Sequence, residues 1–234
     1  MPDPRVHVAD AAALARMLVR EAATVCAHAL ATRGAWTIAV PGGSVLELLV
    51  PALAEAALPW DRAHLVQCDE RVVPAGDPRS NWSALRALPA FAHLAGAMLH
   101  RMPVELGEDA PVVYEETLTR VAGRPPVLDI VLLGIGEDGH VASLFPGHAV
   151  ARATSASVVM EHDAPKTPPQ RLSLTLPVLT GASLTVLAAF GTSKRDAVRR
   201  TLDPQGDVPA AAVFRGARRA LLLIDPAAAP NSAG

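Results

Sequence analysis

Short, continuous apolar runs alternate along the chain with longer segments whose apolar positions recur at helical spacing. The runs predicted as strands lie at residues 36–40, 64–68, 127–133, 156–160, 171–176, 184–190 and 220–224. Runs that are apolar throughout are typical of parallel strands buried on both faces. The pattern therefore predicts an α/β fold with three layers: a mostly parallel, open, Rossmann-like β-sheet with helices on both faces.

Capping residues mark the predicted helices. Asp10 is a good N-cap for a helix that runs to about Thr32, and Gly34 is a natural stop. Pro51 lies inside an apolar helical pattern and predicts a kink or a restart. Further helices are predicted from Ser80 onward, over residues 111–121, and after Lys194 as far as Leu202.

The chain shows no internal repeat. Its most polar, proline-rich segment, residues 162–170, lies between two predicted strands and is therefore expected to be a loop rather than a linker. We expect one domain covering residues 1–234, with a tail that frays from about residue 226.

Composition narrows the classes of partner. Hydrophobic residues make up 50% of the chain and aromatic residues 3%, so Ala, Val, Leu and Ile must fill the core. The net charge of −2 provides no basic field for nucleic acid. An anionic small molecule would have to be held by local cations.

Several other classes of protein are disfavoured. No run is long and apolar enough for a membrane span, and the N-terminus has no apolar leader. Cys26 and Cys68 are expected to be buried thiols, and no Cys/His set has zinc spacing. We expect a cytoplasmic monomer with no metal, nucleic-acid or membrane partner.

Residues 129–146, DIVLLGIGEDGHVASLFP, carry the most chemical information. A buried strand runs into a glycine-rich turn at the carboxyl end of the sheet, where open α/β proteins bind their substrates. Within this turn, His140 stands close to Asp138 and is a candidate general base oriented by that carboxylate. A histidine that only packs or caps at a strand end is the alternative.

The same turn also matches the dinucleotide pattern G-x-G-x-x-G at Gly134, Gly136 and Gly139. Two of its variable positions are Glu137 and Asp138, whose carboxylates would face a pyrophosphate. The turn also lies past the middle of the chain rather than at the first strand-to-helix junction. Both facts disfavour a dinucleotide site.

Two other strand ends carry groups suited to an anion. Gly42, Gly43 and Ser44 lie between a strand and a helix, where backbone N–H groups, a hydroxyl and the helix dipole suit a phosphate. The alternative there is an ordinary glycine turn with a serine cap. Lys194 follows Gly191-Thr-Ser at a similar junction, although a lysine in a first helical turn is usually only solvated.

Charged residues mark two further strand ends. Asp69, Glu70 and Arg71 end one strand, as either a structural ion pair or a ligand clamp. Arg171 begins a strand after the proline-rich loop and is expected to point at the same edge of the sheet.

Together these segments resemble the 6-phosphogluconolactonases of the glucosamine-6-phosphate isomerase/6-phosphogluconolactonase family. The matching segments, in the order expected for the family, are Pro41-Gly-Gly-Ser44, Asp69-Glu-Arg-x-Val-Pro74 with Ser80-Asn81 behind it, residues 133–146, Arg171-Leu-Ser-Leu-Thr-Leu-Pro177 and Gly191-x-x-Lys194. The Gly-Glu-Asp-Gly-His block is the most specific of them.

The resemblance implies a carboxylic ester hydrolase that opens 6-phospho-D-glucono-1,5-lactone without a metal or organic cofactor. It implies His140 as the base, Asp138 as the group that orients it, and Arg71 or backbone N–H groups as donors to the oxyanion. Asp69 would shape the site. The residues implied to hold the phosphate are Gly42, Gly43, Ser44, Arg171 and Lys194.

The chain departs from the family at Val45 and Leu46, where Thr-Pro is common, so weaker phosphate binding is expected. The nearest alternative is a glucosamine-6-phosphate isomerase/deaminase, which resembles this chain in the same histidine block but uses a glutamate in a following Asn-Glu-Pro segment. No glutamate occurs here between Glu137 and Glu161, which favours the lactonase. The other alternative is a sugar-phosphate-binding protein without catalysis.

Overall fold

A computed structural model of the protein describes residues 5–230. The N-terminal residues 1–4, considered above for a leader, and the last four residues of the tail lie outside the described residues.

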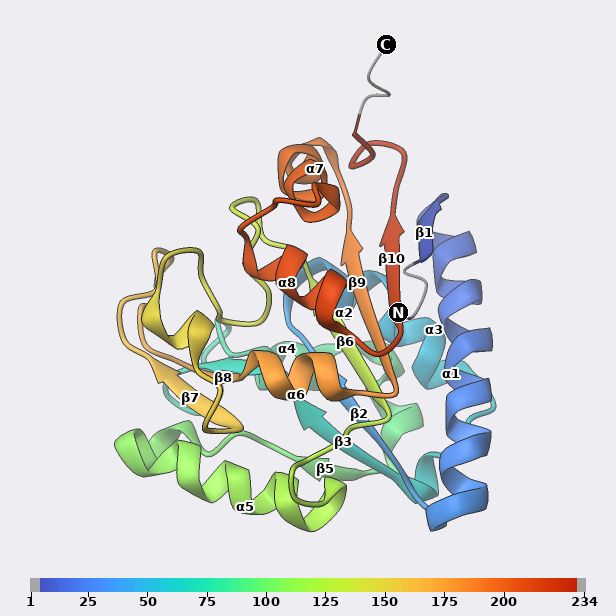
Figure 1. The fold of residues 1–234 in the computed structure, drawn as a ribbon. Coiled ribbons are helices and arrows are strands. Elements are labelled where there is room, and N and C mark those ends of the chain that lie inside the picture. The colour runs from blue at the N-terminus through green and yellow to red at the C-terminus, as the bar shows by residue number, and fades with distance from the viewer. Residues whose placement is uncertain (1–4, 231–234) are drawn as a thin grey trace.

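A parallel sheet of seven strands forms the centre of the molecule (Figure 1). Its order is β1-β10-β9-β6-β2-β3-β5, and every neighbouring pair is parallel. The strands are β1 Arg5–Val8, β2 Trp36–Val40, β3 Ala63–Gln67, β5 Met98–His100, β6 Ile130–Gly134, β9 Leu184–Ala189 and β10 Ala220–Ile224. The predicted fold class is confirmed, although the short strands β1 and β5 were not predicted.

The strand order places a topological switch point between β2 and β6. From β2 the chain proceeds through β3 to β5, whereas from β6 it proceeds the other way through β9 to β10. Loops leaving two such strands diverge and open a crevice at their carboxyl ends. Gly42 to Ser44 leave β2 there, and the turn with His140 leaves β6.

A second, antiparallel sheet of three strands lies beside the first. It has the order β4-β8-β7, with β4 at Asp69–Arg71, β8 at Arg171–Leu174 and β7 at Val158–Glu161. The sequence pattern had placed Asp69 to Arg71 simply at the end of a strand, and it gave no sign that they pair with β8. Backbone pairing puts Arg71 directly opposite Arg171.

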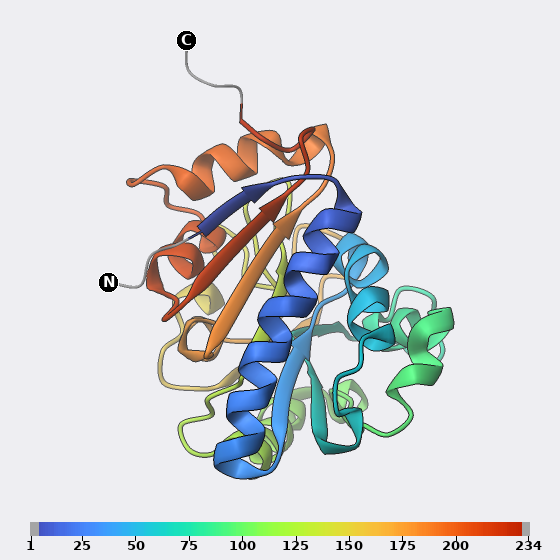
Figure 2. The same ribbon diagram turned by 90° about the vertical axis from the view of Figure 1, so that its right-hand side faces the viewer.

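Helices cover both faces of the main sheet, and Figure 2 shows α1 lying along one of them. Alternate residues of a strand point to opposite faces. Ile38 of β2 therefore belongs to the core that contains residues of α1, α2 and α3, and Ala39 belongs to the core that contains residues of α5 to α8. The α-helices are α1 Ala11–Arg33, α2 Gly43–Leu48, α3 Val50–Glu55, α4 Asn81–Ala87, α5 Ala110–Ala122, α6 Leu176–Gly181, α7 Arg195–Leu202 and α8 Pro209–Gly216. Short 3-10 helices occur at Trp60–Arg62, Pro89–Leu94, Val104–Asp109, Ala149–Arg152 and Thr192–Lys194.

Capping residues end these helices where the sequence predicts. The Asp10 carboxylate accepts from the Ala13 N–H at 2.7 Å, and Gly34 takes a left-handed conformation with φ of 73°. Pro51 lies at the start of α3, so the apolar pattern restarts there rather than continuing. No helix within residues 5–230 is long and apolar enough to cross a bilayer.

The tail from residue 226, where fraying is expected, is described as far as Pro230 and makes contacts there. Ala228 is fully buried, and its N–H bonds to the carboxylate of Asp225 at 2.8 Å. The Arg195 guanidinium donates to the Ala227 carbonyl at 3.0 Å. These contacts hold this end of the chain against α7.

Candidate active site

A cavity of about 340 Å³ opens at the carboxyl ends of β2, β3, β6 and β9. Its wall contains every predicted site residue except Asp138, which lies directly behind His140. The predicted residues on the wall are Gly42, Gly43, Ser44, Asp69, Arg71, His140, Arg171 and Lys194. Segments more than 100 residues apart in sequence thus meet at the switch point.

His140 is oriented by Asp138. Its Nδ1 lies 2.5 Å from the Asp138 Oδ1, and its backbone N–H donates to the same oxygen at 3.2 Å. Burial by itself raises the pKa of Asp138, but the hydrogen bond and charge of His140 outweigh it and hold that pKa below the usual range. An ionised carboxylate accepts from Nδ1–H, so the neutral ring presents Nε2 as a proton acceptor.

The imidazole has little room to move. A Cβ on Gly136 would lie 2.0 Å from the His140 Nδ1, so only glycine allows the ring to lie over this backbone. The other neighbour is the buried ring of Phe145, whose centroid is 4.6 Å from that of His140. These contacts fix the ring in the orientation that Asp138 selects.

Helices α7 and α8 hold the turn that carries His140. Arg200 donates to the Asp138 carbonyl at 3.2 Å, and the Ala210 N–H donates to the Gly139 carbonyl at 3.0 Å. Gly139 has φ of 87°, and a Cβ there would meet Val208 at 2.6 Å. No helix begins directly at this turn, and the next one along the chain starts at Ala149, so the glycine pattern lacks the helix N-terminus that a dinucleotide pyrophosphate requires.

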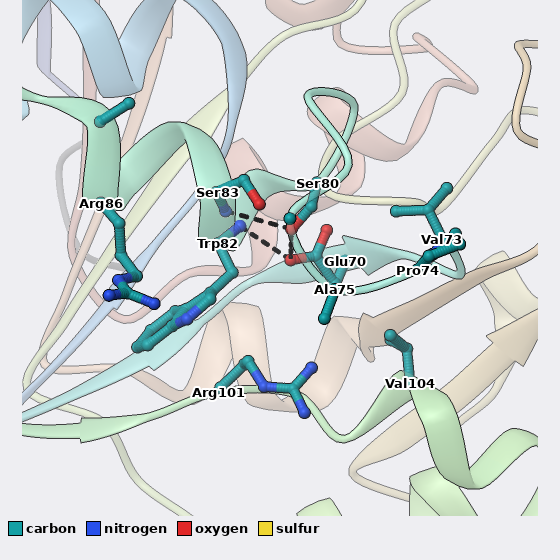
Figure 3. A pocket seen from close by; sticks show the side chains of 12 residues that line it. Glu70, Val73, Pro74, Ala75, Ser80, Trp82, Ser83, Arg86, Arg101 and Val104 are labelled. Atoms are coloured by element: carbon teal, nitrogen blue, oxygen red, sulfur yellow. Dashed lines mark hydrogen bonds between the residues drawn. The ribbon is translucent and has the colours of Figure 1, made fainter.

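The three residues of β4 alternate between two sides of the strand. Asp69 and Arg71 face the active-site cavity, whereas Glu70 faces a second pocket on the other side (Figure 3). Asp69 is buried and accepts from the Ser143 hydroxyl at 2.7 Å and the Asn81 amide at 3.2 Å. Its carboxylate is therefore held by neutral donors rather than by Arg71.

Glu70 anchors the start of α4. Its two carboxylate oxygens accept from the backbone N–H groups of Arg71, Asn81 and Trp82, and from the side chains of Gln67 and Ser80, all between 2.7 and 2.9 Å. Figure 3 shows the bonds from Ser80 and Trp82. The side chain is 1% exposed. It is thus a structural residue that fixes β4 relative to α4.

Arg71 remains available to a ligand. One Nη donates to the Arg79 carbonyl at 2.5 Å, while the buried Nε has no partner among the described residues. Burial next to a ligand-sized cavity makes an unpaired guanidinium nitrogen a candidate donor to an oxyanion.

The glycine turn after β2 forms another part of the wall. Gly43 has φ of 67°, and a Cβ on Gly42 would lie 1.9 Å from the Asn81 side-chain oxygen. Glycine is therefore required where this turn meets α4. The departure at Val45 and Leu46 falls in the core, since both side chains are 1% exposed and neither lines the cavity.

Lys194 ends a 3-10 helix after β9 and is half-buried in the cavity wall. Burial lowers the pKa of its ammonium group, an effect that nearby Glu137 and Asp138 partly offset. An anion that entered the cavity would compensate the same desolvated charge.

The cavity also contains residues that sequence reasoning missed. Asn81 was predicted as a helix start and as part of the family resemblance but not as a site residue, and Lys166 and Thr167 only as part of a surface loop. Arg79 and Ala142 gave no signal; Ala142 has φ of 49°, a strained value for a residue with a side chain. Within residues 5–230 no three His, Cys, Asp or Glu side chains are placed to hold a metal ion.

The chain is similar to proteins of one known family. The family model described as "Glucosamine-6-phosphate isomerases/6-phosphogluconolactonase" matches residues 9–222. The 6-phosphogluconolactonase of Streptomyces coelicolor is 37% identical, and the human one 33% identical; each match covers 93% of this chain and 88% of the relative.

Solved structures show the same fold. The 6-phosphogluconolactonase from Trypanosoma cruzi superposes with a TM-score of 0.85 at 23% identity, covering 100% of this chain and 99% of the other. The enzyme from Leishmania guyanensis gives a TM-score of 0.79 at 27% identity, covering 97% of each chain. With a model that matches nearly the whole chain and relatives at 33–37% identity, the chain belongs to the glucosamine-6-phosphate isomerase/6-phosphogluconolactonase family.

Proposed function

We propose that this protein hydrolyses 6-phospho-D-glucono-1,5-lactone to 6-phospho-D-gluconate, the second step of the oxidative pentose phosphate pathway. The observation that carries the proposal is the 2.5 Å contact between His140 and Asp138 at the wall of a cationic cavity. The curated relatives named above are 6-phosphogluconolactonases, which supports the same substrate.

His140 acts as the base in the first half of the reaction. Its Nε2 takes a proton from a water molecule, and the water oxygen forms a bond to the lactone carbonyl carbon C1. The imidazolium that results is stabilised by the Asp138 carboxylate on Nδ1. The carbonyl electron pair moves to oxygen and creates a tetrahedral oxyanion.

The oxyanion needs preorganised donors. Arg71 is suited to this role because its Nε is buried without a partner among the described residues. Backbone N–H groups of the surrounding turns are the alternative donors. Asp69, held by Ser143 and Asn81, shapes the wall beside Arg71.

Collapse of the oxyanion completes the reaction. The bond between C1 and the ring oxygen breaks, and the imidazolium of His140 returns its proton to that oxygen, which becomes a hydroxyl. The new carboxylic acid ionises in solution. Because the lactone is an activated ester, one base and one charge stabiliser are sufficient.

The phosphate binds where cations and backbone donors gather. Gly42, Gly43 and Ser44 supply N–H groups and a hydroxyl, and Lys194 supplies a charge. Arg171 also lines the cavity, although two of its N–H groups bond to protein carbonyls.

An isomerase/deaminase activity is disfavoured by the missing acid. Among the described residues that line the cavity there is no glutamate. Glu161, the first after Glu137, is buried and accepts from His148 at 2.9 Å and from the Asp163 N–H at 2.8 Å. Neither contact lies at the cavity.

The test supplies freshly generated lactone and follows acid release above the spontaneous rate. We expect strong acceleration by the wild-type protein and a loss of at least about 100-fold in His140→Ala. No acceleration by the wild type would refute the function. A fully active His140→Ala would refute the mechanism alone, and ammonia release from glucosamine 6-phosphate would favour the isomerase. If the protein binds 6-phosphogluconate without turnover, it is a binding protein.

A further inference from the structure

The loop between β7 and β8, residues 162–170, is tied down at both ends. The Ala164 N–H donates to the Pro169 carbonyl at 3.0 Å, which closes the loop on itself. The Val72 N–H donates to the Gln170 carbonyl at 3.0 Å, which ties the loop to the residue that follows β4. The loop therefore has a defined position beside the cavity.

Arg171 fixes the part of the loop nearest the cavity. Its Nε donates to the Pro168 carbonyl at 3.1 Å and its Nη2 to the Lys166 carbonyl at 2.9 Å. The residue is 5% exposed, and its guanidinium carbon lies 5.8 Å from the centre of the Phe145 ring. A buried guanidinium with two bonds to one loop acts as a pin for that loop.

The pinned segment places Lys166 and Thr167 in the cavity wall. Lys166 is close enough to Lys194 for its charge to lower the pKa of that amine, after the larger effect of burial. Asp69 is the one carboxylate among the described residues of the wall, which also contains Arg71, Arg79 and Arg171. Such an excess of cations suits a dianion.

The choice of lysine is itself informative. The chain has 21 cationic Lys and Arg residues, yet only Lys166 and Lys194 are lysines, and both line this one cavity. Everywhere else the chain uses arginine. An ammonium is a compact point charge with three rotatable donors, whereas guanidinium is a wide planar fork, so the two are not interchangeable at a crowded phosphate.

We propose that Lys166 is a second phosphate-binding lysine, which grips the phosphate together with Lys194, and that Arg171 is a positioning residue that presents Lys166 by holding its loop. This assignment rests on the proposed lactonase function and specifies how that site distinguishes phosphorylated from unphosphorylated lactones. In this proposal Arg171 holds the loop that carries Lys166, instead of contacting the phosphate directly as the family resemblance implies.

The kinetic test compares two substrates that differ only in the phosphate: the 6-phosphorylated lactone and glucono-1,5-lactone. For Lys166→Met we expect kcat/KM on the phosphorylated substrate to fall by about 10- to 100-fold, mainly through KM, as for a lost charged hydrogen bond. Turnover of the unphosphorylated lactone should stay unchanged. Equal losses on both substrates, or no loss on either, would overturn the assignment of Lys166.

A double-mutant cycle tests Arg171. Arg171→Lys keeps the charge but loses the two-carbonyl pin, and it should lower kcat/KM on the phosphorylated lactone in the wild-type background. In the Lys166→Met background the same change should cost almost nothing, because its effect passes through Lys166. Additive losses would show that Arg171 contacts the phosphate itself. Unchanged turnover of glucono-1,5-lactone checks that the variants are folded.

A second readout needs no turnover. With two lysines in the chain, acetylation followed by peptide mass spectrometry measures each side-chain amine separately. Inorganic phosphate should protect both amines, whereas gluconate should protect neither. Protection of Lys194 alone would overturn the proposal for Lys166. If the wild type proves inactive on the lactone but phosphate protects both amines, the proposed function is refuted, whereas phosphate binding by Lys166 and Lys194 is supported.

Discussion

Gly136 offers the sharpest test of how the candidate base is held. In Gly136→Ala, the new Cβ would lie 2.0 Å from the His140 Nδ1, 2.1 Å from its Cε1 and 2.7 Å from the Asp138 Oδ1. Ordinary contacts begin at 3.4 Å. The ring must therefore retreat by about 1.4 Å, and this movement breaks its hydrogen bond to Asp138.

A misplacement of about 1 Å can cost about 100-fold in rate, equivalent to about 2.7 kcal/mol of transition-state stabilisation. We expect kcat/KM for lactone hydrolysis to fall by at least this factor. The backbone of Gly136 does not require positive φ, so alanine is compatible with the fold. Far-UV circular dichroism and the thermal midpoint should change little.

Gly181→Ala is the matched control, since a Cβ there meets nothing within 4 Å and its φ is not positive. It should leave kcat/KM at the wild-type value. In a His140→Ala background, Gly136→Ala should have almost no further effect, because the ring it displaces is gone. Near wild-type activity of Gly136→Ala with His140 present would refute the reasoning.

Three further outcomes are expected. Burial alone would raise the pKa of Asp138, but the hydrogen bond and charge of His140 outweigh burial and lower that pKa below its usual value. The ionised carboxylate therefore stabilises the fold at neutral pH, and this contribution is lost as pH falls below about 4. The difference in urea midpoint between wild type and Asp138→Asn should shrink toward about pH 2, and a constant difference would contradict the assignment. Glu70→Gln replaces an acceptor oxygen with a donor facing other donors, and should lower the free energy of unfolding by about 1–3 kcal/mol in urea titrations, whereas an unchanged value would argue against the anchor. Saturation with 6-phosphogluconate at about 100 times its Kd should stabilise the protein by about 2.7 kcal/mol, equally in His140→Ala; no shift in the thermal midpoint of either protein would argue against product binding.

Helix ends and side-chain contacts could be predicted from the sequence where the residues that determine them are close together in the chain. Asp10 and Gly34 delimit α1 because capping depends on bonds within a turn. His140 and Asp138 are two residues apart, so their contact follows from the turn that carries them. The expected single domain, monomeric state and cytoplasmic location, by contrast, stay predictions.

Pairing between strands that are far apart in the chain could not be predicted from the sequence. Arg71 of β4 lies opposite Arg171 of β8 in an antiparallel pair, although the two residues are 100 positions apart in the sequence. No nearby residue marks either strand as part of a second sheet. The five bonds to Glu70 were missed for a different reason: their donors lie within 12 residues of it, but no sequence pattern marks the fold of the loop that brings Ser80 to Trp82 back to it.

The sequence by itself determined the parallel sheet, the caps of its helices, and the carboxylate and histidine in one turn, because apolar periodicity and turn chemistry act over a few residues. Only the tertiary structure decided which loops face the same cavity. The order β9-β6-β2-β3 brings four strand ends together, and it is set by packing between segments far apart in the chain. Arg171 depends on that packing: it was expected to point at the sheet edge, and the fold directs two of its N–H groups to the carbonyls of the loop that carries Lys166.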